Sequence, residues 1–417
     1  MEGGVKMSNQ MSIPAGIDDF REAREKSQYY IDKTLMIQDF LSYQDYVSLI
    51  TRPRRFGKTM NMTMMRDFFD ISQKSEDIFS GLAIMETEYA SQLNSRPVIF
   101  LSFKGCSGAN LEELKVSLAF AIKDEFIKFE KIMIDSKKVD LESNDYYEFY
   151  HLCKTFNWLV AKEEKDIRIA DITIKRSLLV LTRVLRIFYD QKPLVLIDDY
   201  DQPIINATIN GFLKAFSSNV YANFLGEALK GNNCIHQALL TGVQPVIDDS
   251  FNNLSFHTVA DDEYANCFGF TVDETERALA DHGMILNEEV KSFYDGYCIG
   301  GYDIYNPWSI HKYLAVGNLA PYWADASISA PIGRIILTAN HEFQEDFEEL
   351  IRDGEIESFA RLKTSFYDLE TPSIILWDLL VNFGYLTIES ALGGGDYIVR
   401  IPNQEVKMEL RKFLIIL

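Results

Sequence analysis

A basic segment of the chain combines residue types that bind phosphate in many proteins. Gly57, Lys58 and Thr59 follow an apolar run, Tyr46–Thr51, and precede a helical pattern. In a phosphate-binding loop, backbone N–H groups and a helix N-terminus surround the phosphates, the lysine reaches the β and γ oxygens, and the hydroxyl ligates Mg²⁺. The segment therefore predicts a site for ATP and Mg²⁺, with Lys58 as a catalytic candidate and Thr59 as a metal ligand.

The loop departs from the G-x-x-x-x-G-K-[ST] pattern at its first position. Arg52 stands where glycine is expected, and Pro53 stiffens the turn. Arg54 and Arg55 carry charge that can form charge-assisted bonds to phosphate. Taken alone, the segment leaves open a basic surface turn without a ligand. The residues expected to contact the nucleotide are Arg54, Arg55, Phe56, Gly57, Lys58, Thr59 and Met60.

A second apolar run, Pro193–Ile197, ends in carboxylates. Asp198 and Asp199 follow it directly, and Asp201 comes two residues later. In a P-loop NTPase the first acid at such a strand end binds the Mg²⁺ shell, and a neighbouring acid orients the attacking water. We assign these roles to Asp198 and Asp199, with Asp201 as a further candidate. Because ligands gather at the carboxyl ends of parallel strands, this pair favours a functional site over an ordinary acidic loop.

A third apolar run, Ala238–Val243, contains one polar side chain, Thr241. Its hydroxyl is a candidate for a position between the two motifs, where it would contact the γ-phosphate. A threonine that only caps a strand end is the alternative, and the sequence leaves both open. Tyr30 and Asp32 precede the phosphate loop. They are expected either to line the adenine side of the site or to fasten the N-terminal segment.

The elements that must position these residues alternate between strands and helices. Near-continuous apolar runs predict buried parallel strands at Tyr46–Thr51, Pro97–Phe103, Pro193–Ile197 and Ala238–Val243. Helical patterns separate or follow them at Thr59–Asp70, Leu111–Phe129, Thr173–Tyr189 and Gly211–Lys230. This alternation predicts the α/β class, with a doubly wound parallel sheet of the P-loop NTPase kind.

The chain is expected to have three parts: a P-loop core, a helical lid and a small winged-helix-like module, at residues 1–270, 271–344 and 345–417. The core carries a mostly helical insertion at about 105–191, since one crossover normally needs only one helix. The lid is interrupted by a Gly- and Tyr-rich segment, Tyr294–Trp308. The winged-helix-like prediction rests on a helix near Ser373–Asn382 followed by a Gly-rich hairpin.

Composition narrows the class of protein further. The chain has 417 residues, 47% apolar and 25% charged, as in soluble globular proteins, and its net charge is −21. Binding of nucleic acid depends on accumulated positive charge, so this acidic chain is not expected to bind DNA or RNA through its bulk surface. No apolar run reaches the roughly 18 residues of a membrane helix, and no signal peptide is evident, so a cytoplasmic protein is expected. Five scattered cysteines support neither a zinc site nor a disulfide framework.

Further motifs occur in order along nearly the whole chain: Tyr30–Thr34, Thr51–Thr59, Leu196–Asp201, Phe268–Thr271, Tyr294–Tyr297, Tyr305–Ser309, Tyr322-Trp323, Gly384–Thr387 and Ile401–Val406. Together they resemble the AAA-ATPase-like family, whose members are often fused to a PD-(D/E)XK nuclease segment. The resemblance implies a P-loop ATPase core, a lid and a small C-terminal module. It also implies that Arg52 is a family trait, and that glutamate usually stands where this chain has Asp199.

The nuclease segment itself is expected to be absent. Asp396, Glu405 and Lys407 imitate its acid and Glu-x-Lys pattern, but Pro402 and Asn403 interrupt the strand that should carry it. The same residues belong to the Ile-Pro-Asn-x-Glu-Val motif of the resembled family.

Two readings of the nucleotide site stay open, with a third from another class. The first is a slow Mg²⁺-dependent ATPase or a nucleotide-controlled switch, with a protein partner or a homo-oligomer as its context. The second is a non-hydrolysing nucleotide sensor or scaffold, because Asp199 is one methylene shorter than glutamate and a shift of about 1 Å can cost a hundredfold in rate. The third is a winged-helix nucleic-acid adaptor, against which the acidic charge weighs.

Overall fold

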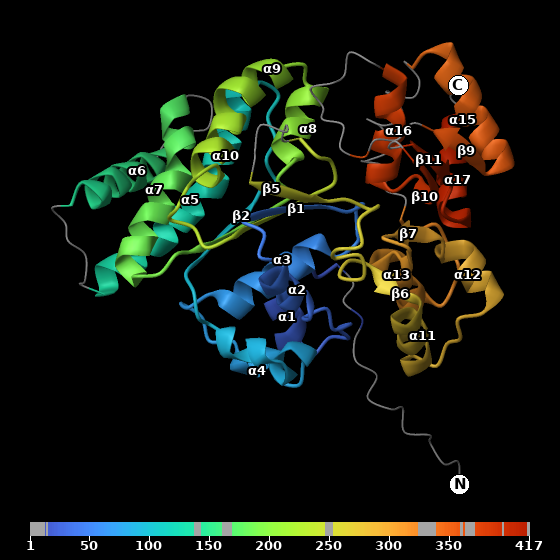
Figure 1. Ribbon diagram of the computed structural model, residues 1–417, viewed down its shortest axis with the longest axis horizontal. Helices are drawn as coiled ribbons and strands as arrows, with labels where there is room; N and C mark the ends of the chain where they lie inside the picture. The colour runs from blue at the N-terminus through green and yellow to red at the C-terminus, as the bar shows by residue number, and fades with distance from the viewer. Residues whose placement is uncertain are drawn as a thin grey trace, which may run out of the picture.

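A computed structural model describes residues 13, 16–136, 143–160, 169–246, 253–323, 339–358, 362, 372–393 and 396–414. Its centre is a five-stranded parallel sheet with helices on both sides (Figure 1). The strands, in the spatial order β2-β3-β4-β1-β5, are β1 (Val47–Thr51), β2 (Val98–Ser102), β3 (Leu194–Asp198), β4 (Ala238–Gly242) and β5 (Leu254–His257). The predicted α/β class is confirmed, and the sheet fits a P-loop-like fold.

The order of the strands is what assembles the site. β4 lies between β1 and β3, so that the carboxyl ends of all three strands are neighbours. The four expected strands are present because their apolar runs are buried, as in β1, β3 and β4. β5 was not predicted, since its sequence alternates between apolar and polar residues and it is only partly buried at the sheet edge.

Figure 1 shows the N-terminal helices on one side of the sheet and the helices of the central segment on the other. The N-terminal helices are α1 (Phe20–Glu25), α2 (Met36–Tyr43), α3 (Lys58–Phe69) and α4 (Glu76–Phe79), followed by 3₁₀ turns η1 (Ala83–Glu86) and η2 (Glu88–Gln92). The central helices are α5 (Leu111–Ser136), α6 (Asn144–Val160), α7 (Asp171–Tyr189), α8 (Gln202–Ile209), α9 (Leu213–Phe216) and α10 (Ala222–Leu229). A π-helical turn, Ser217–Tyr221, joins α9 to α10, which the uniform pattern Gly211–Lys230 did not reveal.

The segment expected to be a helical lid contains a small sheet as well. Its helices are α11 (Val272–Asp281), α12 (Glu288–Tyr294) and α13 (Pro307–Val316). β6 (Phe270–Thr271), β8 (Tyr302–Tyr305) and β7 (Tyr297–Ile299) form an antiparallel sheet in that order. The sequence predicted helices interrupted by the Gly- and Tyr-rich segment Tyr294–Trp308, and β7 and β8 lie within that segment. Gly300 and Gly301 both have positive φ and form the two-residue turn of the β7–β8 hairpin, a signal visible in the sequence.

In the C-terminal part, the described residues form three helices and a second antiparallel sheet, of order β10-β11-β9. Its elements are α15 (His341–Asp353), β9 (Glu355–Ser358), α16 (Pro372–Phe383), β10 (Thr387–Gly393), β11 (Asp396–Arg400) and α17 (Gln404–Leu414). The expected helix and hairpin are present as α16, β10 and β11. The winged-helix arrangement stays a prediction. Glu405 and Lys407 lie in α17, so the nuclease-like pattern has no strand to carry it.

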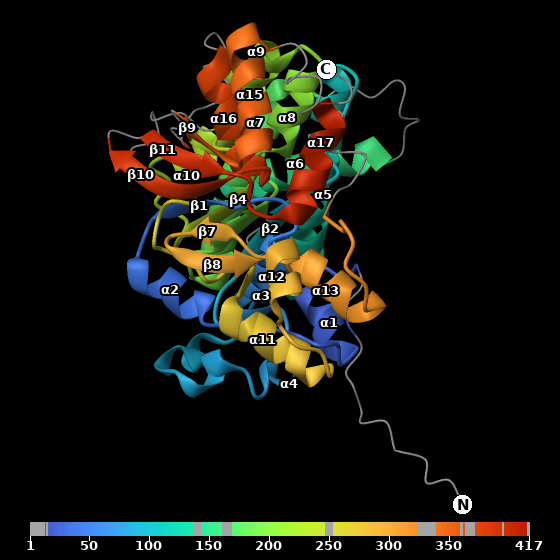
Figure 2. The ribbon, with the colours of Figure 1, turned by 90° about the vertical axis from the view of Figure 1, so that its right-hand side faces the viewer.

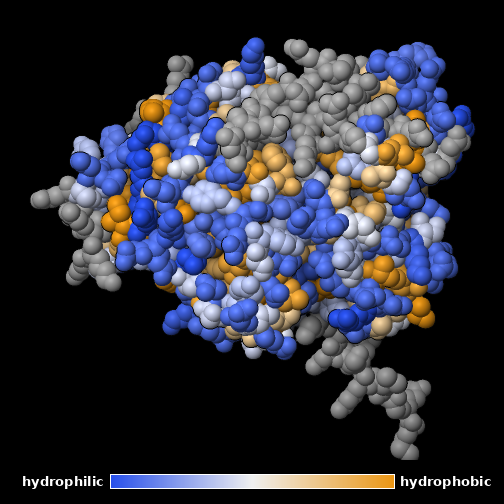
Figure 3. All heavy atoms as spheres, in the orientation of Figure 1, coloured by the Kyte–Doolittle hydropathy of each residue, from blue (hydrophilic) through white to orange (hydrophobic). Residues whose placement is uncertain are grey.

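The two C-terminal parts are packed differently against the core. Apolar side chains of α16 and β11 belong to the same buried cluster as the central sheet, whereas α11–α13 enclose a separate small cluster. Figure 2 shows the β7–β8 hairpin and α11–α13 beside α3, with β9–β11 and α15–α17 on the other side of the hairpin. Within the described residues, no helix is long and apolar enough to cross a membrane. The face in Figure 3 is mostly hydrophilic, with apolar side chains in separate patches.

Candidate functional site

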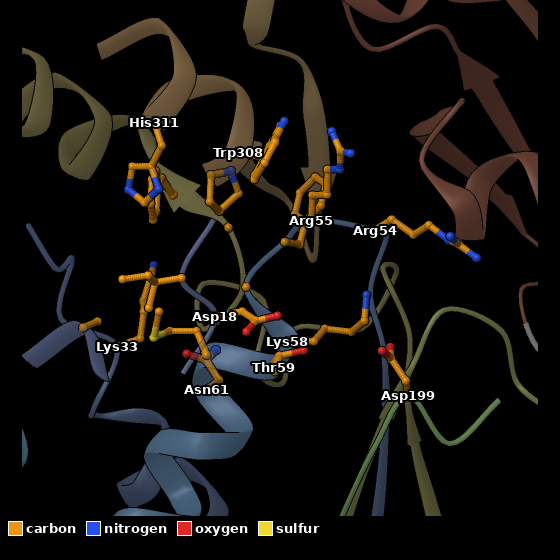
Figure 4. Close-up of a pocket in the computed structure, with 18 of the residues that line it drawn as sticks. Asp18, Lys33, Arg54, Arg55, Lys58, Thr59, Asn61, Asp199, Trp308 and His311 are labelled. Carbon is orange, nitrogen blue, oxygen red and sulfur yellow. The ribbon is translucent and has the colours of Figure 1, made fainter. Parts of the chain in front are cut away.

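A cavity of about 610 Å³ opens between the central sheet and α13. Such a volume lies within the roughly 300–1,000 Å³ of ordinary small-molecule sites. Figure 4 shows Lys58, Thr59 and Asp199 on one side of the cavity, and Trp308 and His311 of α13 on the other. The cavity therefore lies between the predicted phosphate loop and helix α13.

The phosphate loop ends at the N-terminus of α3. Gly57 has a φ of 83°, which glycine adopts without strain, and it turns the chain into the helix. No side chain caps this helix. Its first backbone N–H groups and the positive end of its dipole are thus available for an anion at the cavity floor. Arg54, Arg55, Phe56 and Met60 also line the cavity, so every predicted loop contact lies at its wall.

Asp198 lies beneath the cavity and holds the hydroxyl groups of two threonines. It is fully buried and accepts hydrogen bonds from the Thr59 hydroxyl at 2.8 Å and from the Thr241 hydroxyl at 2.8 Å. Neither Asp198 nor Thr241 lines the cavity, whereas Thr59 does. Burial, followed by the charge of Asp199, raises the pKa of Asp198 to about 7. Of the three residues, Thr59 is the one at the surface of the cavity, whereas Thr241, expected to contact the γ-phosphate, lies beneath the cavity and donates to Asp198.

The geometry of Thr59 suits a metal ligand. A hydroxyl has one proton to donate and two lone pairs, and the proton of Thr59 is already used on Asp198. Its oxygen therefore offers only acceptor lone pairs to the cavity. The described residues contain no group of three or more His, Cys, Asp or Glu arranged to hold a metal.

The side chain of Lys58 is buried and folds back onto its own loop. Its ammonium donates to the backbone oxygen of Arg52 at 3.0 Å and to that of Pro53 at 2.9 Å. Burial lowers the pKa of Lys58, while the nearby carboxylate of Asp199 opposes that shift. In Figure 4 the Asp199 carboxylate faces the Lys58 ammonium. The ammonium of Lys58 thus lies between the backbone oxygens of its own loop and the carboxylate of Asp199.

Asp199 and Asp201 differ in what their carboxylates do. Asp199 lines the cavity and has a φ of 50°, a left-handed conformation in which aspartate is enriched. Asp201 is buried, and one of its oxygens accepts from the backbone N–H groups of Val243 and Gln244, both at 2.8 Å. Asp201 also lines the cavity, but one of its oxygens is used to fix the loop after β4.

Arg52 explains the missing glycine of the phosphate loop. Its side chain is fully buried and points away from the cavity, which it does not line. The guanidinium donates to four backbone oxygens, those of Thr51, His257, Thr258 and Glu263, at 2.8–3.2 Å. Arg52 thus ties the end of β1 to the loop after β5. It is a structural residue, and the part of the loop that lines the cavity begins after it, at Arg54.

The next residues of the loop contact both C-terminal parts. The Arg55 guanidinium stacks on Trp308 and donates to the backbone oxygens of Tyr322 and Trp323. The Arg54 guanidinium lies over the ring of Phe383 in α16, and Figure 4 shows it pointing away from Lys58. Both arginines line the cavity, yet their charged ends are turned toward these partners.

Gly384 marks the closest approach of the C-terminal part to the loop. It has a φ of 88°, and an added Cβ there would lie 2.9 Å from the Cβ of Pro53. Tyr297 donates its hydroxyl proton to the backbone oxygen of Gly384, and its ring packs edge-on against Phe56. The loop, the β7–β8 hairpin and the end of α16 therefore form one packed joint.

Glu405 completes this joint from α17. Its buried carboxylate accepts from the backbone N–H of Trp323 at 2.6 Å and from the Ser309 hydroxyl. Burial, opposed by these hydrogen bonds, raises the pKa of Glu405 to about 7. Glu405 of the Ile-Pro-Asn-x-Glu-Val motif thus holds the backbone at Trp323 and the side chain of Ser309 in this joint.

The raised pKa of Glu405 predicts a pH-dependent stability. The native state keeps a proton that the unfolded chain releases above its ordinary pKa of 4.5, so this group costs stability as pH rises from there to about 7. Glu405→Gln cannot ionise. Between about pH 5 and pH 8 its free energy of unfolding should therefore rise by about 1–3 kcal/mol relative to wild type. Urea denaturation at both pH values measures this, with Glu348→Gln on an exposed part of α15 as control. An unchanged pH dependence in Glu405→Gln would contradict the assignment.

The structure also adds cavity residues that the sequence did not single out. Asp18 and Lys104 line the cavity and form an ion pair with each other. Lys104 follows the end of β2, so the rule that ligands gather at strand carboxyl ends could have found it. No pattern in the sequence marked Asp18. Tyr30 lines the cavity as one alternative predicted, whereas Asp32 bonds Thr34 and the backbone of Ala83 and so has the fastening role.

Known proteins resemble this chain both in part and along its length. A family model described as Predicted AAA-ATPase matches residues 14–252, more than half of the chain. That span contains the phosphate loop, Asp198 and Thr241. A relative described as an uncharacterized protein in the vnfD 5' region of Azotobacter chroococcum mcd 1 is 23% identical over 413 residues, covering 97% of this chain and 70% of that protein. The likeness to the relative thus extends through both C-terminal parts.

Proposed function

The chain belongs to the predicted AAA-ATPase family, and we propose that it binds ATP together with Mg²⁺ in the cavity above α3. One observation carries the proposal. The Thr59 hydroxyl, at the start of α3, gives its proton to the carboxylate of Asp198 at the end of β3 and turns its lone pairs to the cavity. A phosphate-binding helix end and a metal-orienting carboxylate are thereby joined through one residue.

In this proposal each part of the floor has one task. The N–H groups at the start of α3 and the Lys58 ammonium hold the phosphate oxygens. Thr59 is the protein ligand of Mg²⁺, and the buried carboxylate of Asp198 holds the Thr59 hydroxyl in place. When bound, Mg²⁺ neutralises charge on the phosphates. Thr241 fixes the other oxygen of Asp198, which keeps the carboxylate in one orientation.

The outcome of binding is a slow ATPase or a nucleotide-controlled switch. Asp199 is the residue that decides between hydrolysis and a non-hydrolysing sensor, because its short carboxylate must orient the attacking water. We further propose the division into a core at 1–270, a lid at 271–344 and a C-terminal module at 345–417. The joint at Pro53, Arg54 and Arg55 then transmits occupancy to a protein partner or to a second copy of the chain.

Substitutions at Asp198 and Asp199 test the two halves of this proposal. Mg²⁺ is expected to raise the ATP affinity of wild type, and the factor of this increase should be at least about tenfold smaller in Asp198→Asn. A charge-assisted contact is worth about 1.5–3 kcal/mol, which corresponds to this loss. Calorimetry with and without Mg²⁺ measures the gain. An identical gain in folded Asp198→Asn protein would refute the metal site.

Turnover then separates the ATPase from the sensor. If Asp199 orients water, Asp199→Asn should abolish phosphate release while ATP binding stays within a few fold of wild type. Asp199→Glu restores the longer carboxylate. Turnover that is absent in wild type and appears in Asp199→Glu identifies the sensor, whereas measurable turnover in wild type that Asp199→Asn removes identifies the slow ATPase.

A further inference from the structure

Lys104 stands at the phosphate end of the cavity, on the strand next to the acidic one. β2 pairs with β3 so that Ser102 is opposite Asp198, and the N–H of Phe103 donates to the backbone oxygen of Asp198 at 2.9 Å. Lys104 and Asp199 therefore both lie at the edge of the sheet where β2 and β3 end. Both residues line the cavity. The register thus places a lysine beside the acidic strand end, on the side opposite the phosphate loop in the strand order.

The ammonium of Lys104 is held only loosely. Its ion-pair partner is Asp18, and the two side chains are 61% and 52% exposed. Exposed pairs of this kind contribute little stability, so a stronger anion can displace the carboxylate. In Figure 4 the Asp18 carboxylate lies over the start of α3, near Lys58 and Thr59. Asp18 thus presents a carboxylate to the region where phosphate oxygens are expected.

The other cations of the loop are bound to protein partners. Arg52 is buried among backbone oxygens, Arg54 lies on Phe383, and Arg55 lies on Trp308. Lys58 serves one side of the phosphates. NTPases of this kind use a second cation to balance the charge of the terminal phosphate, supplied either by the same chain or by a neighbour. Among the lysines and arginines that line the cavity, Lys104 is the one whose partner is a displaceable surface carboxylate.

We propose that Lys104 is a γ-phosphate-binding residue of this chain, which leaves Asp18 when a nucleoside triphosphate enters the cavity. The inference rests on the proposed function, because it names a further residue of that site. It makes Asp18 a carboxylate that the triphosphate displaces. The second cation then comes from the chain itself and needs no neighbouring subunit.

Comparing ATP with ADP tests the role of Lys104 without requiring hydrolysis. Lys104→Ala is expected to lower the affinity for ATP about tenfold or more, the value of one charge-assisted hydrogen bond, and to leave the affinity for ADP unchanged. Lys104→Arg should keep the preference for ATP. Lys26→Ala serves as a matched control, since Lys26 is also an exposed lysine paired with a carboxylate. Calorimetric titration of the full chain with each nucleotide and Mg²⁺ gives the affinities.

The possible outcomes are distinct. Equal losses for ATP and ADP in Lys104→Ala, or no loss for either, would overturn the inference while leaving the nucleotide site intact. Asp18→Asn removes the partner and keeps Lys104, so it should preserve or raise ATP affinity. A loss as large as that of Lys104→Ala would assign the effect to the ion pair and overturn the inference. If wild type binds neither nucleotide, the proposed function fails, and the role of Lys104 fails with it.

Discussion

Replacing Lys58 by alanine is expected to lower the affinity for ATP by about a hundredfold or more. The ammonium is buried against the phosphate loop and donates to the backbone oxygens of Arg52 and Pro53. Two charge-assisted bonds to phosphate are worth about 3 kcal/mol or more, which corresponds to this loss. Calorimetric titration with ATP and Mg²⁺ measures the change, and circular dichroism verifies the fold.

Two variants make this loss specific to Lys58. Lys58→Arg keeps the charge but not the compact ammonium, so it should recover only part of the affinity. Arg54→Ala removes a guanidinium that stacks on Phe383, and its loss should be smaller than that of Lys58→Ala. ATP affinity that is unchanged in folded Lys58→Ala protein would mean that the loop does not hold the phosphates.

The second large effect is expected from restoring the glycine that the phosphate loop lacks. Arg52→Gly should destabilise the protein by at least about 3 kcal/mol and should not improve ATP binding, because the buried oxygens of Thr51, His257, Thr258 and Glu263 lose their donor. It also leaves a cavity where a fully buried side chain stood. Urea denaturation gives the free energy of unfolding.

Arg54→Gly is the matched control for Arg52→Gly. It introduces the same backbone freedom two residues later, at a side chain that is only partly buried. Its stability should therefore fall by about 1 kcal/mol or less. If Arg52→Gly is as stable as Arg54→Gly, or binds ATP more tightly than wild type, then Arg52 belongs to the ligand site and its structural role is wrong.

The sequence predicted those parts of the fold that depend on local patterns. Buried strands such as Leu194–Asp198 are continuous apolar runs, and the turn at Gly57 has the residue types of a phosphate loop. The edge strand Leu254–His257 escaped prediction because its alternating residues do not identify a partner strand. The hairpin at Gly300 was missed although its turn residues were visible, because its strands are very short.

Long-range juxtapositions in the site were beyond the sequence. The sequence showed that Arg52 replaces the glycine of the pattern, but its buried role was hidden because three of its four hydrogen-bond acceptors lie more than 200 residues away along the chain. The pairing of Asp18 with Lys104 joins positions 86 residues apart. Asp198 was predictable, but its separation from the cavity by Thr59 depends on how β3 and α3 pack. Arg334 is an isolated basic residue of the expected lid, for which the sequence offers either a γ-phosphate contact or an ordinary surface position, and it lies outside the described residues.

Several motifs that are far apart in the sequence contact the phosphate loop around Pro53. Gly269 donates its N–H to the backbone oxygen of Phe56, Tyr297 packs on the same ring, and Gly384 contacts Pro53. Glu405 holds the backbone of Trp323, whose oxygen accepts from Arg55. Motifs scattered over the last third of the chain therefore meet at the phosphate loop. A ligand that repositions Arg54 or Arg55 would act on both C-terminal parts through these contacts.

Titration of wild-type protein with ATP, once with Mg²⁺ and once with Mg²⁺ chelated, tests the central claim most directly. The account predicts saturable binding of one ATP per chain, with affinity lower by about tenfold or more when the metal is removed. Binding should also raise the thermal midpoint, since a ligand of the native state stabilises it. An absence of saturable heat and of any thermal shift, in protein that is folded by circular dichroism, would contradict the nucleotide site itself.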